Sequence, residues 1–193
     1  MTQTWIAFLR AVNVGGRKVE MARLRDLLGA GPGLARVRTY IASGNVFFDS
    51  DTTSDSNPGG AEARAALTAT IERRLREEFG FEVPTLLRTL DEVESSLALA
   101  AAPFGKVVVT PDVRLSVVFT SGPLVGLTPP LVSPKGDWEI VGATAGEAFV
   151  VSRLQDGRLG ANPIAAIEKT YGVRATARFF HTMAKIVTAA KKP

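Results

Sequence analysis

The sequence predicts an α+β fold built from two ferredoxin-like (βαββαβ) halves packed side by side, with mainly antiparallel sheets. Strand and helix patterns in residues 1–88 follow the order β-α-β-β-α-β, which is the ferredoxin-like order. Residues 89–193 repeat most of that order, and a length of 193 residues suits two small units. We therefore expect an N-terminal half over residues 1–88 and a C-terminal half over residues 89–193.

The first half begins with a strand and a helix. Residues 4–10 are apolar on both faces, which predicts a strand in the centre of its sheet. Apolar residues then recur at helical spacing in residues 21–28, and the glycines and proline of residues 29–33 end that helix. Side chains alternate over residues 35–41, which predicts a half-buried strand. A returning strand begins at Val46.

The remainder of this half is a polar loop, a helix and a strand. Residues 49–60 are of low complexity, so we expect a flexible loop. Residues 61–79 have the pattern of a long amphipathic helix. Residues 81–87 read as a short strand, and Pro84 places it at a sheet edge because proline donates no ladder hydrogen bond.

The second half opens with a capping-box pattern from Thr89 to Glu92, which predicts a helix to about residue 102. Asn162 followed by Pro163 predicts the start of another helix, which ends at Gly172. Residues 121–136 are rich in proline and glycine and show no helix pattern. Strand patterns occupy the segments 113–120, 138–141, 148–152 and 174–180, and a last helix covers 182–190.

Composition excludes several chemistries. There is no cysteine and one histidine, His181, so disulfides, thiolate metal sites and poly-histidine sites are excluded. No P-loop or dinucleotide fingerprint is present, and we expect neither a metal nor a cofactor. No signal peptide or membrane-spanning run is visible, so we expect a cytoplasmic protein with no membrane partner.

Positive charge is concentrated at the two ends of the chain. Residues 1–50 carry seven Lys/Arg against three Asp/Glu, and residues 174–193 carry five against none. Residues 51–173 carry eleven against sixteen. If the ends fold close together, they form one basic patch that would attract an anion or a polyanion. The alternative is a solvated surface without a partner.

Two loop motifs are expected to meet at one end of the first sheet. The motif of residues 13–18 follows the first strand, and Ser43-Gly44-Asn45 follows the second. A right-handed β-α-β crossover makes these strands parallel, so both loops lie at the same end. Glycine amides, basic side chains and neutral polar groups would then form a phosphate or carboxylate site. The predicted binding residues are Arg10, Asn13, Gly15, Gly16, Arg17, Lys18, Ser43, Asn45 and, near the C-terminus, Arg178.

A structural interpretation of the same motifs stays open. Two glycines shape a loop, and asparagine beside glycine is common in turns. His181 is likewise a candidate base or a surface histidine.

The motifs resemble a known family. The segments Leu9–Gly16, Met21–Leu28 and Val37–Phe48, with a weaker likeness at the C-terminus, closely resemble the bacterial family called domain of unknown function 1697. Phe179-Phe180-His181 stands where that family usually carries Asn-Trp-Asn. The resemblance implies a tandem ferredoxin-like fold and no established activity.

We therefore predict an uncharacterised protein that binds a phosphate-bearing ligand or nucleic acid at the basic loops. Tyr40, Phe47 and Phe48 are candidate rings for base stacking. One alternative is an enzyme acting on a small anionic substrate in a cleft between the halves, and no catalytic residue is identified for it. The other alternative is a protein-interaction module. The sequence leaves the oligomeric state open.

Overall fold

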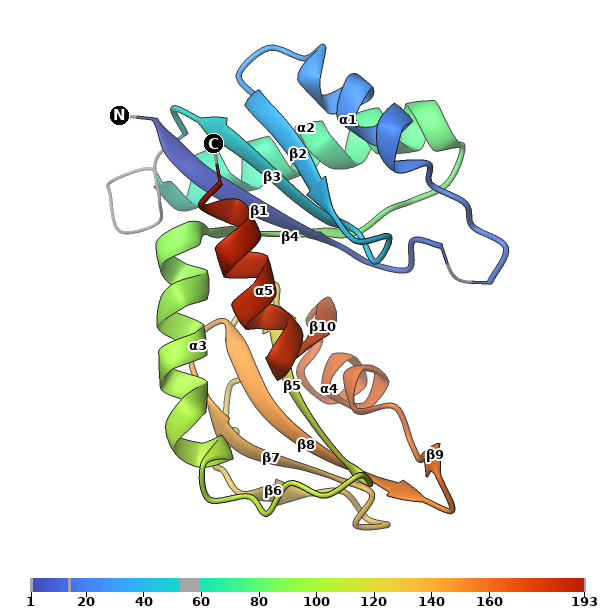
Figure 1. The fold of residues 1–193 in the computed structure, drawn as a ribbon, viewed down its shortest axis with the longest axis vertical. Helices are drawn as coiled ribbons and strands as arrows, with labels where there is room; N and C mark the ends of the chain where they lie inside the picture. Colours follow the sequence, from blue (N-terminus) through green and yellow to red (C-terminus); the bar gives the residue numbers. More distant parts are fainter. Residues whose placement is uncertain (1, 14, 53–59, 193) are drawn as a thin grey trace. The chain divides into compact units, whose positions relative to one another are not determined.

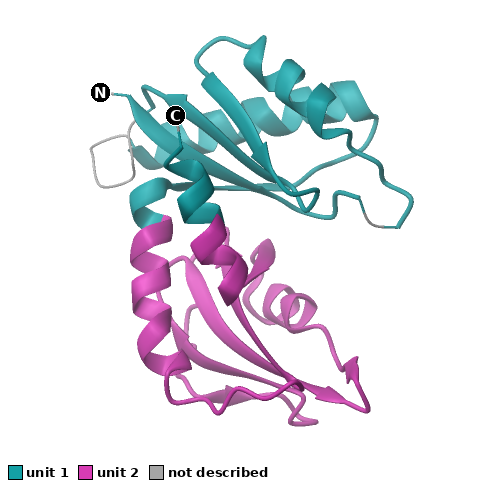
Figure 2. Cartoon of the chain, viewed as in Figure 1, with its two compact units in different colours: residues 1–92, 186–193 teal, residues 93–185 magenta. Residues whose placement is uncertain are grey.

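The computed structural model describes residues 2–13, 15–52 and 60–192, which form five helices and ten strands with antiparallel pairing (Figure 1). The chain divides into two compact units (Figure 2): residues 1–92 with 186–193, and residues 93–185. The expected boundary at residue 88 lies close to the first division, but residues 186–193 group with the N-terminal unit. The last helix therefore contains residues of both units.

The first unit contains one four-stranded sheet with strand order β2-β3-β1-β4, in which all neighbours are antiparallel. Its elements are β1 (Gln3–Leu9), α1 (Met21–Gly29), β2 (Ala35–Tyr40), β3 (Asn45–Ser50), α2 (Gly60–Phe79) and β4 (Thr85–Thr89). The central position of β1 and the edge position of β4 are confirmed. The strand expected from residue 81 starts only at Thr85, after the proline.

A core cluster of this unit lies on the face of the sheet that α1 and α2 cover. Trp5, Ala7 and Leu9 of β1 alternate onto this face, and Val46 and Phe48 of β3 join them. Helices α1 and α2 supply Leu24, Leu28, Ile71 and Leu75 to the same cluster. The period of 3.6 residues therefore identified the core-facing side chains of the two helices.

Two expectations about this unit need correction. The alternation expected over residues 35–41 is not clean, because Arg38, Thr39 and Tyr40 are all half-buried and the strand ends before Ile41. The polar loop begins later than expected, because Asp49 and Ser50 are buried members of β3. The flexibility expected for this loop falls largely on residues 53–59, which lie outside the described residues.

The second unit contains a larger antiparallel sheet of order β10-β5-β8-β7-β6, with β9 paired to β8. The expected hairpin is confirmed by the pairing of β7 with β8. The elements that lie wholly or partly in this unit are α3 (Leu90–Phe104), β5 (Val113–Thr120), β6 (Leu131–Val132), β7 (Trp138–Ala143), β8 (Glu147–Gln155), β9 (Arg158–Leu159), α4 (Pro163–Tyr171), β10 (Ala175–Phe179) and α5 (Phe180–Ala190).

Both predicted helix starts are confirmed. The Thr89 amide donates to the Glu92 carboxylate at 2.7 Å, and the Glu92 amide donates to Thr89 Oγ1 at 3.2 Å. This reciprocal pair is a capping box. Asn162 Oδ1 accepts from the Ile164 amide at 3.0 Å, which caps α4. None of the helices in the described part of the chain is long and apolar enough to span a membrane.

Candidate functional site

The two sequence motifs meet at one end of the first sheet, as expected. Asn13 Nδ2 donates to the Ala42 carbonyl at 2.8 Å, and Asn13 Oδ1 accepts from the Val19 amide at 2.9 Å. The Leu9 amide donates to the Gly44 carbonyl at 2.8 Å. Asn13 thus uses both ends of its amide to join the loop after β1 to the turn after β2.

The Ser43-Gly44-Asn45 turn is built into the packing of this end. Asn45 is 0% exposed, and its Nδ2 donates to the Tyr40 carbonyl and to Ser43 Oγ, each at 3.1 Å. Gly44 has φ +78°, and a Cβ there would lie 2.6 Å from Val12 Cγ2. These contacts favour the structural interpretation of Asn45, and its role in ligand binding stays a prediction.

The glycine-rich part of the first loop faces open space. Gly15 and Gly16 have φ of +58° and +82°, and a Cβ at either position would meet no atom within 4 Å. The Arg17 guanidinium lies 5.5 Å from the centroid of the Phe81 ring, in cation–π geometry. Lys18 is exposed. Arg10, half-buried at the end of β1, donates its backbone amide to the Pro84 carbonyl at 2.9 Å.

Arg178 belongs to the second unit, whereas the other eight predicted residues belong to the first. It is 8% exposed on β10, and its guanidinium donates to Thr176 Oγ1 at 3.1 Å and to the Ala177 carbonyl at 2.8 Å. Burial lowers the pKa of Arg178 to about 10, so the side chain still carries its charge at neutral pH.

A pocket of about 430 Å³ in the first unit was not predicted from the sequence. It opens at β2, which is an edge strand of the sheet. Three of its lining side chains are cationic, and no carboxylate belongs to the described residues that line it. The lining consists of Arg25 from α1, Arg38, Thr39 and Tyr40 from β2, Phe47 from β3, and Ala189 and Lys192 from the C-terminal segment.

Alternation along β2 places Arg38 and Tyr40 on the face opposite the core, because Val37 packs against the core cluster. Arg38 is paired across the strands with Phe47, and its guanidinium lies 5.7 Å from the centroid of that ring. Sheet register therefore fixes the position of this cation.

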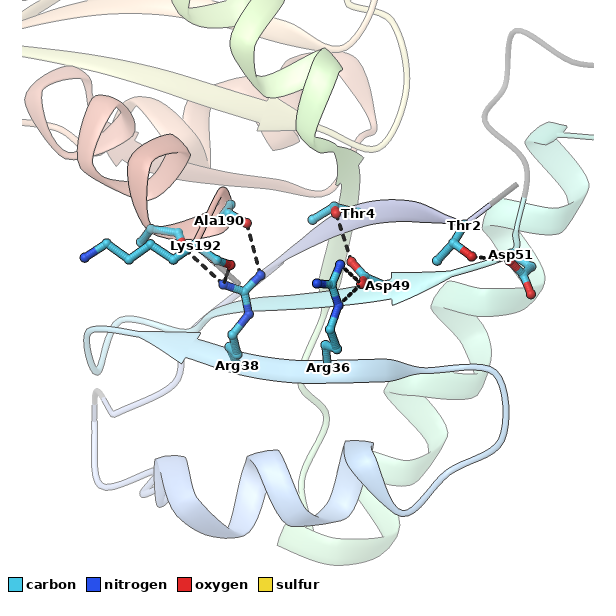
Figure 3. Close-up of polar contacts among 9 residues, drawn as sticks. Thr2, Thr4, Arg36, Arg38, Asp49, Asp51, Ala190 and Lys192 are labelled. Carbon is cyan, nitrogen blue, oxygen red and sulfur yellow. Dashed lines mark hydrogen bonds and ion pairs between the residues drawn. The ribbon is translucent and has the colours of Figure 1, made fainter.

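The last turn of α5 is held by the same arginine (Figure 3). Arg38 donates to the carbonyls of Ala189 at 3.2 Å, of Ala190 at 3.0 Å and of Lys192. The final carbonyls of a helix have no partner within the helix and carry partial negative charge, so a guanidinium is favoured there. The contact joins residues about 150 positions apart, and no local sequence pattern signals it.

The other pocket cations are more accessible. Arg25 is exposed, and its Nη1 donates to Thr39 Oγ1 at 2.8 Å. Lys192 is exposed too, and its side chain extends away from Arg38 in Figure 3. The concentration of charge at the chain ends was the one sequence signal for this cluster, since Arg25 and Arg38 come from the first segment and Lys192 from the last.

The expected stacking role of two aromatic residues is wrong. Phe48 is 0% exposed in the core, and Phe47 is 1% exposed beneath Arg38. A base therefore has no access to either ring. Tyr40 is half-buried and lines the pocket. Within the described ranges, no group of three or more histidine, aspartate or glutamate residues is arranged to hold a metal ion.

These features define an α+β protein with antiparallel sheets and a basic pocket in its first unit. The chain belongs to the family described as "Protein of unknown function (DUF1697)", whose model matches residues 1–129. A solved structure of the conserved bacterial protein SP0830 from Streptococcus pneumoniae is similar over 100% of both chains, with a TM-score of 0.67 and 22% identity. This likeness concerns the fold alone. A search of curated proteins found no match.

Proposed function

We propose that the protein binds a phosphate-bearing ligand in the pocket at β2. The observation that carries this proposal is that Arg25, Arg38 and Lys192 line one pocket whose described lining includes no carboxylate. Cations with no carboxylate beside them raise the local concentration of anions. Arginine also presents a planar fork of donors that matches phosphate oxygens.

The contacts and exposure of the three cations support a phosphate-binding site rather than a charged surface that binds no ligand. Arg38 is fixed by carbonyls and an aromatic ring, so its side chain is already ordered before a ligand arrives. Arg25 and Lys192 are exposed, so a ligand in solution can reach both side chains. A volume of about 430 Å³ falls within the range of small-molecule sites.

The loop residues predicted to bind a ligand belong to the same unit as the pocket. Four residues of the first loop are exposed in the same unit: Gly15, Gly16, Arg17 and Lys18. The Ser43-Gly44-Asn45 turn is separated by Ile41 and Ala42 from the β2 residues that line the pocket. We regard these loops as a second basic surface that attracts the same class of ligand. Arg178 has no assigned place in it, because it lies in the other unit.

We also propose that both units have a ferredoxin-like fold and that the protein is cytoplasmic. The order β2-β3-β1-β4 with two helices supports a ferredoxin-like first unit. In the second unit, β10-β5-β8-β7 repeats that order, with residues 121–136 in place of the first helix. The absence of cysteine supports a reducing compartment.

Calorimetric titration with ribose 5-phosphate and with inorganic phosphate, at low and high ionic strength, tests the proposal. We expect saturable binding that weakens with salt, and a loss of affinity of about tenfold or more in the double variant Arg25→Gln/Lys192→Gln. Arg73→Gln/Arg76→Gln is the control matched in charge, because both arginines form exposed ion pairs away from the pocket lining. Equal affinity in the pocket variant and the control would refute the pocket.

A variant in the loop separates the two basic surfaces. If Arg17→Gln lowers the affinity for ribose 5-phosphate as much as Arg25→Gln/Lys192→Gln does, the ligand contacts both surfaces. If Arg17→Gln alone lowers it, the loops hold the phosphate and the pocket does not.

One observation favours the alternative of a protein-interaction module. The edge strand β6 exposes Leu131 at 37% and Val132 at 55%, and exposed edges pair readily with another chain. Sedimentation of the protein over a range of concentrations would test this, since a concentration-dependent mass that is lost in Val132→Lys supports it. The alternative of an enzyme acting on a small anionic substrate in a cleft between the halves stays a prediction.

A further inference from the structure

We propose that the pocket at β2 is a mononucleotide site, in which the Tyr40 ring stacks on the base while Arg25 and Lys192 hold the phosphate. This inference rests on the proposed function, because it requires the phosphate to bind in the same pocket. The inference adds that the phosphate is attached to a nucleoside whose base also binds in the pocket.

Tyr40 is placed to act as a flat apolar platform. It follows Arg38 by two residues on β2, so both side chains lie on the sheet face away from the core. Its backbone carbonyl accepts from the buried Asn45 at 3.1 Å, which fixes the end of the strand. A half-buried ring on a fixed backbone loses little freedom when a base stacks on it.

The number of accessible rings indicates one base rather than several. RNA-recognition sheets stack two or three bases on aromatic side chains of neighbouring strands. In this sheet Phe47 lies beneath Arg38 and Phe48 lies in the core, so Tyr40 is the accessible ring among the described residues that line the pocket. The volume of about 430 Å³ is at the small end of the range for ligand sites, which suits a single nucleotide.

The cations line the same pocket as this ring. Arg25 donates to Thr39 Oγ1 at 2.8 Å on the face of β2 opposite to Tyr40, and it lines the pocket at this edge of the sheet. Lys192 lines the same pocket from the C-terminal segment, where Arg38 holds its backbone carbonyl. A nucleotide offers the matching chemistry, because an aromatic base and an anionic phosphate are joined by one sugar. A sugar phosphate satisfies the cations but leaves the ring without a partner.

The test is a calorimetric titration with the four nucleoside 5′-monophosphates and with ribose 5-phosphate, using the full chain. We expect at least one nucleotide to bind roughly 5- to 150-fold more tightly than ribose 5-phosphate, which is the range that base stacking on an aromatic side chain supplies. Tyr40→Leu should remove that preference, so that in this variant no nucleotide binds more tightly than ribose 5-phosphate does. Tyr40→Phe keeps the ring and should keep the preference.

The outcomes separate this inference from the proposed function. Binding of ribose 5-phosphate without any tighter nucleotide overturns the mononucleotide site and leaves the phosphate site standing, as does a nucleotide preference that survives Tyr40→Leu. Absence of binding by every compound overturns both. A single-stranded oligonucleotide that binds more than about tenfold tighter than any mononucleotide overturns the single-base site in favour of a nucleic-acid surface.

Discussion

Gly44 and Gly16 both adopt left-handed backbone, but they differ in what surrounds them. A Cβ at Gly44 would lie 2.6 Å from Val12 Cγ2 and 2.8 Å from Leu9 Cβ, whereas a Cβ at Gly16 would meet nothing within 4 Å. Gly16→Ala should therefore cost about 1–2 kcal/mol of unfolding free energy from backbone strain. Gly44→Ala should cost a further 1–3 kcal/mol or so from overpacking.

Urea denaturation of the two variants measures this difference directly. Equal losses of stability would contradict the tight packing of the Ser-Gly-Asn turn. The comparison is matched, because both changes add the same methyl group at a positive φ.

Asn45 supplies a second residue-scale prediction. Its buried amide donates to the Tyr40 carbonyl and to Ser43 Oγ, so Asn45→Ala removes both of these hydrogen bonds from the end of the strand. We expect a loss of about 1–3 kcal/mol in the unfolding free energy, measured by denaturant. The control is Ser95→Ala, at an exposed position on α3, which should change the unfolding free energy by less than about 0.5 kcal/mol. A stable Asn45→Ala protein would argue against the structural role of this side chain.

At this scale the sequence predicted which residues meet but not how each is used. Residue type and topology were enough to bring Asn13 and Asn45 to one end of the sheet. Whether an amide faces solvent or a carbonyl depends on loop geometry, which neither spacing nor composition determines. The structure shows both amides in contacts with their own loops, and their role in ligand binding stays a prediction.

The start of α3 gives a prediction at the scale of an element. Burial alone raises the pKa of Glu92, but hydrogen bonds from Arg64 and from the Thr89 amide outweigh it and hold the pKa below its ordinary value of 4.5. The folded protein therefore favours the carboxylate more than the unfolded chain does. As the pH falls below about 4.5, the unfolded state binds the proton first and stability declines.

Glu92→Gln should flatten the fall of unfolding free energy between pH 6 and pH 3, measured by urea denaturation at each pH. It should also lower stability at neutral pH, because Arg64 loses its charged partner. Glu77→Gln removes a carboxylate from an exposed pair on α2 and should leave the slope close to that of the unaltered protein. Equal slopes for the Glu92 and Glu77 variants would contradict the role of the capping box.

Helix α5 depends on a contact that is distant in sequence. Arg38 donates to three carbonyls at the C-terminal end of this helix, so Arg38→Met should speed hydrogen exchange of the amides in residues 186–192. Amides in the middle of α2 serve as the internal reference, and we expect their exchange to change less. Unchanged protection of residues 186–192 would show that Arg38 does not hold the helix end.

For the whole molecule, local patterns predicted the order of elements well. The strand β4 at an edge, the capping box at Thr89 and the cap at Asn162 all follow from short-range chemistry. The pocket could not be predicted in this way, because it joins α1, β2, β3 and the C-terminal segment. Such a site depends on tertiary contacts. The only feature of the sequence that indicated it was the positive charge at the two ends of the chain.

The central claim is that this chain binds phosphate in the pocket at β2, and an NMR titration tests it most directly. Ribose 5-phosphate is added to ¹⁵N-labelled protein, and the backbone amide shifts are followed to saturation. We predict saturable shifts at Arg25, Thr39, Tyr40 and Lys192, which surround the pocket. Saturable shifts confined to the amides of residues 13–18, or no saturable shifts at all, would contradict it.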